Sequence, residues 1–434
     1  MAVFPRLLFA QDSTLHHLPS AWTLEDCLAY AKNNNIQINS LRLDTKSAEE
    51  DVKQAKAAIL PDLSASVSQN LLNGKNSNAG QGGFQTSPNF SSSYGLNSAI
   101  TVYNGGYLKN NIKSKQLALA SSNLTVRETE NDITLSITQA YLNILLAAET
   151  IGYLKEVLAT SQVQLYLGQQ RFDAGSLARK DFVQQQAQVA SDQYNLVNET
   201  NTYKLNVVAL KQLLQLPSSF TFNIHIPDTI VVQQTVAPLD EMQAAAQNTR
   251  PEVKNGELGI QLAQADLSLV RAAVKPTVSL GAGLATSYSN NESFKYLPQL
   301  NNNFYQSLAL TLGIPIYSRL VNKTNVAKAQ IQIQQANLSL LNTKTILNQQ
   351  VEQAYINLQN AIAQYNAAVV EFKANQEIYT ITNEQLRLGA INLLDVQLQK
   401  NLYVQSLQAL TQAKYTAVLY NKIYAFYTGI PVTL

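Results

Sequence analysis

Residues with the chemistry for catalysis or metal binding are scarce in this 434-residue chain, which has three histidines and one cysteine. His16 and His17 are adjacent and could bind a metal ion, but they fall in a segment that we interpret as a leader or linker. A single cysteine excludes an internal disulfide, and we interpret Cys27 as a packed thiol inside a helical pattern. We therefore assign no metal site and no cofactor.

Motifs of nucleotide binding and nucleophilic catalysis are also missing. The segment "GAGLAT" at 281–286 has the glycines of a phosphate-binding loop, but it lies inside an alternating strand pattern rather than in a strand-turn-helix unit. The sequence contains no recognisable Ser–His–Asp set, paired carboxylates or P-loop. The sequence therefore predicts that the chain is not an enzyme.

The composition is poor in charge without being strongly apolar. Charged residues make up 14% of the chain, compared with about 25% in typical soluble domains, and the mean hydropathy is −0.11. Asn, Gln, Ser and Thr supply the polarity instead. The net charge of +2 gives no electrostatic reason to expect nucleic acid as a partner.

Four segments alternate between apolar and small polar residues, which predicts β-strands over about residues 61–72, 90–104, 276–289 and 304–317. Alternation of this kind over about ten residues is typical of membrane β-barrels, with one face toward lipid and the other toward a watery lumen. A soluble sandwich with one buried face is the alternative. The residues that we expect to face lipid are Leu280, Leu284, Leu308, Leu310, Leu312 and Ile314.

Aromatic residues gather at the ends of these strands, as in the interfacial girdles of membrane proteins. We assign five of them to the interfaces: Tyr94, Tyr103, Tyr288, Tyr305 and Tyr317. Four strands cannot close around a channel, and unpaired strand edges do not occur in lipid. The sequence therefore predicts that several chains share one barrel.

The chain is internally duplicated, with a spacing of 214 positions. "QAYLNIL" at 139–145 returns as "QAYINLQ" at 353–359, and "RFDAGSLARKDFVQQQ" from residue 171 corresponds to "QLRLGAINLLDVQLQ" from residue 385. We divide the chain into a signal-peptide remnant or linker at 1–21, a first repeat at 22–217, a connector at 218–237 and a second repeat at 238–434.

Each repeat contains a very long segment without proline, from about Tyr107 to Phe172 and from Leu320 to Leu388. Apolar residues recur there at alternating spacings of four and three, which is the period of about 3.5 residues that defines a coiled coil. A shorter helix follows each one, with hairpin tips at 173–178 and 387–392. The two seams are Ile133, Ile137, Ala140, Ile144, Ala147, Ile151, Leu154 and Leu158, and 214 positions later Leu347, Val351, Ala354, Leu358, Ala361, Tyr365, Ala368 and Phe372.

The order of four segments within a duplicated chain resembles the TolC-like outer membrane efflux protein family, also called outer membrane factors, from Trp22 to Pro431. The segments are "WTLEDCLAYAKNNN", "LPDLSASVS", "ITVYNGGYLKNN" and "LGIPIYSRLVNK". The resemblance implies a mainly α-helical chain in which tandem-duplicated long coiled-coil helices form a periplasmic tunnel. Four β-strands per chain would contribute to a shared twelve-stranded membrane β-barrel in a homotrimer.

The same resemblance implies a function and partners. The chain would be the outer-membrane exit duct of a tripartite efflux or type I secretion system, with its helices in the periplasm. A periplasmic adaptor, also called a membrane fusion protein, would join it to an inner-membrane transporter of the resistance-nodulation-division or ABC type. A periplasmic coiled-coil adaptor or structural spacer without a pore is the alternative.

The hairpin tips are where the resemblance places the adaptor contact. The positions are Gly175, Ser176, Leu177, Gly389, Ala390 and Ile391. Asp395 aligns with an acidic residue that lines the periplasmic entrance in the family, and Asp181 is its counterpart in the first repeat. Leu398 and Ile391 replace a second acidic residue and a basic residue, so a gate latched by those salt bridges is not expected here. A role for Asp395 in helix N-capping, or as a solvent-exposed residue, is the alternative.

Overall fold

The structure is a computed structural model, which describes residues 19–77, 84–227 and 229–433. His16, His17 and most of the N-terminal 1–21 segment lie outside the described residues. The chain divides into two compact units. We call the first the hairpin unit, which comprises the described part of Met1–Arg42, Thr125–Lys254 and Asn342–Leu434. The second, the sheet unit, comprises Leu43–Leu124 and Asn255–Leu341.

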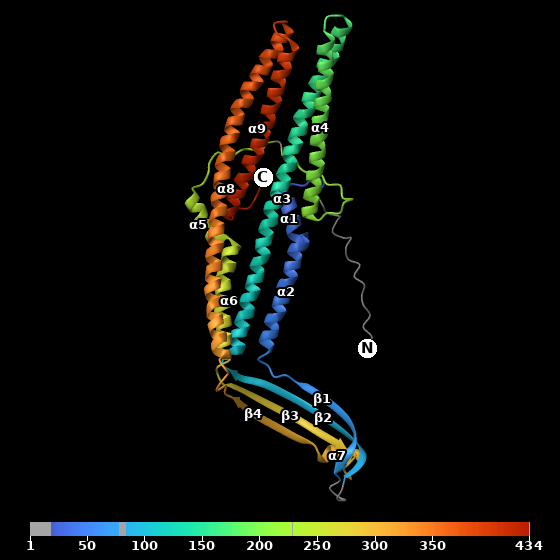
Figure 1. Ribbon diagram of the computed structural model, residues 1–434, viewed down its shortest axis with the longest axis vertical. Helices are drawn as coiled ribbons and strands as arrows, with labels where there is room; N and C mark the ends of the chain where they lie inside the picture. Colours follow the sequence, from blue (N-terminus) through green and yellow to red (C-terminus); the bar gives the residue numbers. More distant parts are fainter. Residues whose placement is uncertain (1–18, 78–83, 228, 434) are drawn as a thin grey trace. The chain divides into compact units, whose positions relative to one another are not determined.

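Within the described residues the fold is mainly α-helical with one four-stranded sheet, as predicted, and apart from α7 the second half repeats the element order of the first (Figure 1). α3 and α8 have 67 residues each, α1 and α5 have 11, and α2 and α6 have 22. The elements are α1 (Leu24–Asn34), α2 (Ile36–Ala57), β1 (Ser64–Ser77), β2 (Phe84–Asn104), α3 (Tyr107–Asp173), α4 (Arg179–Leu214), α5 (Leu239–Thr249), α6 (Pro251–Ala272), β3 (Thr277–Ser289), α7 (Tyr296–Asn302), β4 (Tyr305–Gly313), α8 (Val321–Arg387) and α9 (Leu393–Tyr427).

Local sequence signals account for several of these boundaries. Thr23 begins α1 with a capping box, in which its hydroxyl accepts from the Asp26 N–H and the Asp26 carboxylate accepts from the Thr23 N–H. Pro251 is the first residue of α6, where its missing N–H costs nothing. None of the described helices combines the length and the apolar character needed to cross a membrane.

The predicted coiled-coil seams form the core of the hairpin unit. Ile137 and Ile144 of the first seam are fully buried, and so are Val351 and Leu358 of the second. These helices pair within each repeat, α3 with α4 and α8 with α9 (Figure 1). The period of about 3.5 residues therefore identified the buried stripe of both long helices correctly.

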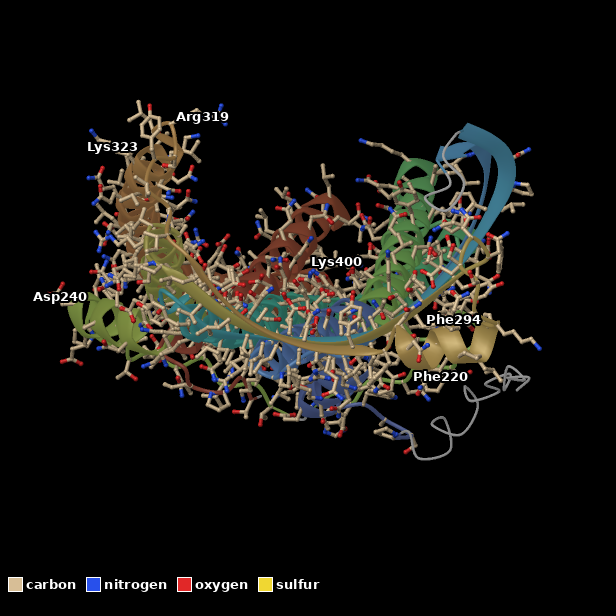
Figure 2. The ribbon with its side chains drawn as sticks, turned by 90° about the horizontal axis from the view of Figure 1, so that it is seen from below. Phe220, Asp240, Phe294, Arg319, Lys323 and Lys400 are labelled. Atoms are coloured by element: carbon tan, nitrogen blue, oxygen red, sulfur yellow. The ribbon has the colours of Figure 1, made fainter. Side chains whose placement is uncertain are left out.

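An aromatic cluster anchors the connector between the repeats to this core. The ring of Trp22 lies 5.3 Å from that of Phe222 and 6.2 Å from that of Phe220, which is labelled in Figure 2. The backbone N–H of Trp22 donates to the Asn223 carbonyl, and the Tyr141 hydroxyl donates to the His225 carbonyl at 2.8 Å. The backbone of His225 therefore takes part in the packing of the connector against the hairpin unit.

The four strands pair antiparallel in the order β1-β2-β3-β4. β1 extends to Ser77 and β2 begins at Phe84, so the first hairpin is longer than the predicted segments. The added residues are mainly Asn, Ser, Gly and Gln, and they lack the apolar alternation on which the prediction depended.

The fourth strand is shorter than predicted, because β4 ends at Gly313. Ile314 and Tyr317 therefore lie beyond the strand in which we placed them. Gly313 pairs with Thr277, so Ile314 would face Pro276. Neither Pro276 nor the nearby Pro315 has an N–H to donate, and the ladder stops.

We predict that Ile144→Ala lowers the free energy of unfolding by about 2–5 kcal/mol, because it leaves a cavity in a fully buried position. The midpoint of guanidinium unfolding, followed by circular dichroism on the purified protein, measures this loss. Lys155→Ala on the exposed side of the same helix is the control, with an expected change within about 0.5 kcal/mol. Equal midpoints for the two variants would contradict the assigned core.

Candidate functional site

The strand register sorts the side chains of β2, β3 and β4 onto two chemically different faces. On the apolar face, Ile100, Leu280 and Leu310 are direct neighbours across three strands. In the next row on this face Ser98 pairs with Ala282, which pairs with Leu308, and in the row after it Leu96 pairs with Leu284. The predicted residues Leu280, Leu284, Leu308, Leu310 and Leu312 thus share one face of one sheet.

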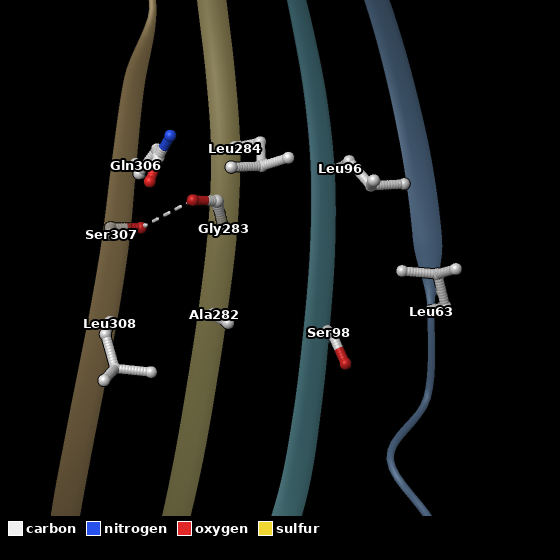
Figure 3. Close-up of a pocket in the computed structure, with 9 residues that line it drawn as sticks. All are labelled: Leu63, Leu96, Ser98, Ala282, Gly283, Leu284, Gln306, Ser307 and Leu308. Atoms are coloured by element: carbon white, nitrogen blue, oxygen red, sulfur yellow. Dashed lines mark hydrogen bonds between the residues drawn. The ribbon is translucent and has the colours of Figure 1, made fainter.

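The opposite face consists of small residues, many of them hydroxylated. Thr101, Ser279 and Thr311 form one row, and Asn97, Gly283 and Ser307 form another. The Ser307 hydroxyl lies 3.5 Å from the Gly283 carbonyl, and Figure 3 draws this contact. No Asp, Glu, Lys or Arg occurs in these rows, so the small face is polar but uncharged.

An irregularity in β2 changes which residue belongs to the apolar face. The pairing of β2 with β3 shifts between Thr101 and Tyr103, so that Tyr103 rather than Val102 is the partner of Val278. A bulge of this kind inserts one extra residue and restarts the alternation. Strict alternation continued from Ile100 would place Val102 on the apolar face, whereas the structure gives that position to Tyr103.

Two of the predicted interfacial aromatics, Tyr94 and Tyr288, belong to a cluster at the end of the sheet next to α7. The Tyr94 and Tyr296 hydroxyls are 2.6 Å apart, and the Tyr288 ring lies 4.8 Å from the ring of Tyr296 and 6.2 Å from that of Phe90. Tyr296 comes from α7, a short helix that the sequence did not predict. Tyr305 begins β4 and is exposed.

The apolar face carries a shallow hollow of about 470 Å³. Leu96, Leu284 and Leu308 project beside it, and Ala282 and Ser98 lie at its centre (Figure 3). The hollow exists because the row that pairs Ser98 with Ala282 has small side chains between two rows of leucine. Its lining offers apolar contact and has no charged group.

The two hairpin tips have the same backbone geometry. Gly175 and Gly389 adopt φ angles of 72° and 73°, in the left-handed region that favours glycine. The Ser176 N–H donates to the Arg171 carbonyl at 2.8 Å, and the Ala390 N–H donates to the Gln385 carbonyl at 2.9 Å. These are Schellman-type helix ends, and both glycines are exposed.

The neighbouring tip residues are accessible as well. Ser176 and Ala390 are exposed, whereas Leu177 and Ile391 are half-buried. A Cβ at either glycine would meet no atom within 4 Å beyond its chain neighbours. The tips therefore present backbone and small side chains that another helix end could approach closely.

Asp395 and Asp181 occupy equivalent positions in the first turns of α9 and α4. The N-cap of α9 is Asn392, whose Oδ1 accepts from the Asp395 N–H at 3.0 Å. The N-capping alternative for Asp395 is therefore wrong. Asp395 is exposed and Asp181 is half-buried, and a carboxylate in a first turn is favoured by the helix dipole.

A buried ionic network that the sequence did not predict connects three helices of the hairpin unit. Lys400 of α9, labelled in Figure 2, donates from Nζ to Asp192 Oδ2 of α4 at 3.0 Å and to the Ser161 hydroxyl of α3. The Ser161 hydroxyl and the Gln188 amide donate to the Asp192 carboxylate. The Lys400 and Asp192 side chains are only 3% and 7% exposed.

One sequence signal could have revealed this network. Lys400 lies between Val396 and Tyr403 at spacings of four and three, so it occupies a position of the apolar seam of α9. A lysine at such a position must find a buried partner. Asp192 is far away in the sequence, however, and only the folded chain identifies it.

A second polar link joins α3 and α9. Glu149 of α3 accepts from Lys414 Nζ at 2.7 Å and from the Tyr415 hydroxyl at 2.9 Å. Burial, reinforced by the nearby Glu149 carboxylate, raises the pKa of Tyr415. The phenol therefore stays protonated and acts as a donor.

Cys27 is the packed thiol that the sequence indicated, and it has no exposed surface. Burial, with a smaller effect from the Asp26 carboxylate, raises its pKa to about 12. The thiolate is therefore not populated near neutral pH, and the thiol is chemically inert.

We predict that Lys400→Met destabilises the protein by about 3–5 kcal/mol, because it leaves the Asp192 carboxylate buried without a cation. The double variant Lys400→Met/Asp192→Leu should recover most of the loss, because neither charge then remains. Unfolding midpoints of the single and double variants measure the coupling. A double variant as unstable as Lys400→Met would contradict the pairing.

Comparison with known proteins agrees with this geometry. The family model described as "Outer membrane efflux protein" matches residues 28–215 and 243–419. BepC of Brucella suis is 21% identical over 402 residues, covering 92% of this chain and 83% of its own length. TolC of Salmonella enteritidis is 21% identical over 422 residues, covering 96% and 84%. A solved structure of CusC superimposes with a TM-score of 0.81 at 18% identity, covering 97% of this chain and 95% of CusC.

The two matched ranges lie in both halves of the chain, and together they take in well over half of it. The chain thus combines a two-faced sheet, paired long helices and glycine tips. It belongs to the outer membrane efflux protein family, whose members are TolC-like channels of the outer membrane.

Proposed function

We propose that the chain is one protomer of a homotrimeric duct through which efflux or type I secretion substrates leave the periplasm. The duct is passive, has no catalytic residues, and takes its driving force from an inner-membrane transporter of the resistance-nodulation-division or ABC type. The observation that carries the proposal is the sorting of the paired strands β2, β3 and β4 into a leucine-rich face and a small polar face.

In this proposal the leucine face contacts the hydrocarbon of the outer membrane, and the small face contacts water in the lumen. The strands have 14, 21, 13 and 9 residues, and about 9–11 residues suffice to cross a bilayer at the usual tilt. Tyr94, Tyr103, Tyr288 and Tyr305 would lie at the two interfaces. Tyr317, beyond the end of β4, would lie at the end of the sheet that also holds Tyr103.

Three copies of the sheet make a suitable barrel. β1 and β4 are the edges of the sheet in the described chain, and their backbone groups need partners in a bilayer. An even number of antiparallel strands allows β4 of one copy to pair antiparallel with β1 of the next. Two copies would give a barrel of about eight strands, and side chains fill the interior of a barrel of that size. Three copies give twelve strands, with room for a lumen.

The hairpin tips are the proposed docking point for a periplasmic adaptor. Gly175, Gly389 and their small neighbours leave open space in which an adaptor helix end could pack. Leu177 and Ile391 would add apolar contact. Asp395 and Asp181 would line the periplasmic entrance, where copies around a threefold axis attract cations. In this proposal residues 22–217 and 238–434 are the two structural repeats, and each contributes one tip.

A periplasmic coiled-coil adaptor or pore-free spacer was the alternative. The family model matches residues on both sides of each pair of strands, and the solved structure of a channel covers nearly the whole chain. A sheet with one mainly apolar, exposed face has no evident role in an adaptor or spacer. The duct is therefore the better explanation.

We predict that Leu310→Lys reduces the amount of assembled protein in outer-membrane fractions, because a lysine facing hydrocarbon costs up to about 2–4 kcal/mol. Thr311→Lys is the matched control, since it introduces the same residue one position along the strand on the opposite face. Fractionation followed by native gel electrophoresis measures assembly. Equal loss in both variants would contradict the assignment of the faces.

We predict that Gly389→Val and Gly175→Val abolish export while the protein still assembles in the outer membrane. Valine at a positive φ costs about 1–3 kcal/mol locally, which distorts the tip without disturbing the core. Gly152→Val is the control, because this glycine also has open space around it but lies within α3. Export by the native host, measured beside trimer content, separates docking from assembly. Normal export by the tip variants would refute the docking assignment.

A further inference from the structure

A cavity of about 260 Å³ lies within the hairpin unit, where side chains of α3, α8 and α9 meet. Three tyrosines line it, one from each helix: Tyr153, Tyr379 and Tyr403. Glu156 and Lys400 also contribute to the lining. Because a water molecule takes up about 30 Å³ in the liquid, the cavity has room for an organic group of several heavy atoms.

The charges around the cavity favour a cation. Lys400 lines it, but its Nζ is held 3.0 Å from the Asp192 carboxylate and bonded to Ser161, so its charge is already compensated. Glu156 is exposed and has no ion-pair partner among the described residues. The uncompensated charge of the lining is therefore negative.

The aromatic lining favours the same kind of ligand. The Tyr379 and Tyr403 rings stack with centroids 5.3 Å apart, and Phe372 extends the row at 5.7 Å from Tyr403. Burial raises the pKa of Tyr153 to about 12 and also raises that of Tyr403, with Glu156 adding to the second shift. Tyr153 and Tyr403 are thus neutral phenols near neutral pH, and the faces of aromatic rings carry the negative potential that attracts cations.

We propose that this cavity binds a small organic cation, an alkylammonium group held by the tyrosine rings and the Glu156 carboxylate. An anion would meet Glu156 with no free cation to pair with. A divalent metal ion would find one carboxylate where it needs several oxygen ligands. The apolar side chain of Leu407 suits the methyl groups of an ammonium ligand. This site lies beyond the duct function, which needs no pocket.

Isothermal titration of the full-length protein in detergent with choline tests the proposal. The matched neutral probe is 3,3-dimethylbutan-1-ol, which has the shape of choline without its charge. We expect saturable choline binding and at least about tenfold weaker binding of the alcohol. A third probe, N-acetyl-lysine amide, presents the ammonium group of a partner's side chain.

Both sources of the ammonium group agree with the proposal and are told apart by the same titration. Tighter binding of choline identifies free quaternary cations as the occupant, and tighter binding of the lysine derivative identifies a side chain. Either result supports the site if it depends on the lining residues. Absence of saturable binding by both cations would overturn it.

Two variants test whether cation binding depends on the residues that line the cavity. Tyr379→Leu should weaken choline binding by about three- to tenfold, and Glu156→Gln, which preserves shape, by about two- to fivefold. Tyr166→Leu, the same substitution at an exposed tyrosine of α3 outside the cavity, should leave the affinity unchanged. If the alcohol binds as tightly as choline, or if Glu156→Gln and Tyr379→Leu bind choline as the parent protein does, the proposal is wrong.

Discussion

Backbone N–H and C=O groups have no water to bond with in hydrocarbon, and this constraint explains most of what is unusual in the chain. Within the described residues every strand of the sheet has at least one antiparallel partner, and only the outer edges of β1 and β4 are open. A sheet with one leucine face cannot leave those edges unpaired in a membrane. In the proposed duct, assembly around a symmetry axis would pair those edges, and the side chains would determine which face turns outward.

The hairpin unit solves a different problem, which is how to hold helices together with few charges. Its apolar seam uses alanines and β-branched residues, so that Ile144, Ala147 and Val351 pack closely along the helices. Where the seam is interrupted by charge, the charge is fully paired. Lys400 and Asp192 satisfy one another together with Ser161 and Gln188, which fixes α3, α4 and α9 in one mutual arrangement. The desolvation of the two buried charges offsets much of the stability that their pairing supplies.

The sequence allowed the long helices, their buried seams, the strands and the glycine tips to be predicted, because each depends on local periodicity or on a single backbone requirement. It did not reveal the bulge that gives Tyr103 the place of Val102, the end of β4 before Ile314, or the extension of β1 to Ser77. Those features depend on which residues face each other across strands, such as Ile314 and Pro276. The Lys400–Asp192 pair and the tyrosine cavity were missed for the same reason, since residues far apart in the sequence form them.

The central claim is that hydrocarbon contacts the Leu310 side of the sheet while water contacts the Thr311 side. Nitroxide spin labels at these two adjacent positions, in protein reconstituted into lipid vesicles, report the environment of each side directly. The account predicts that oxygen, which concentrates in the bilayer, relaxes the label at Leu310 more strongly, and that a water-soluble nickel complex relaxes the label at Thr311 more strongly. The same polarity and the same accessibility at both positions would contradict it.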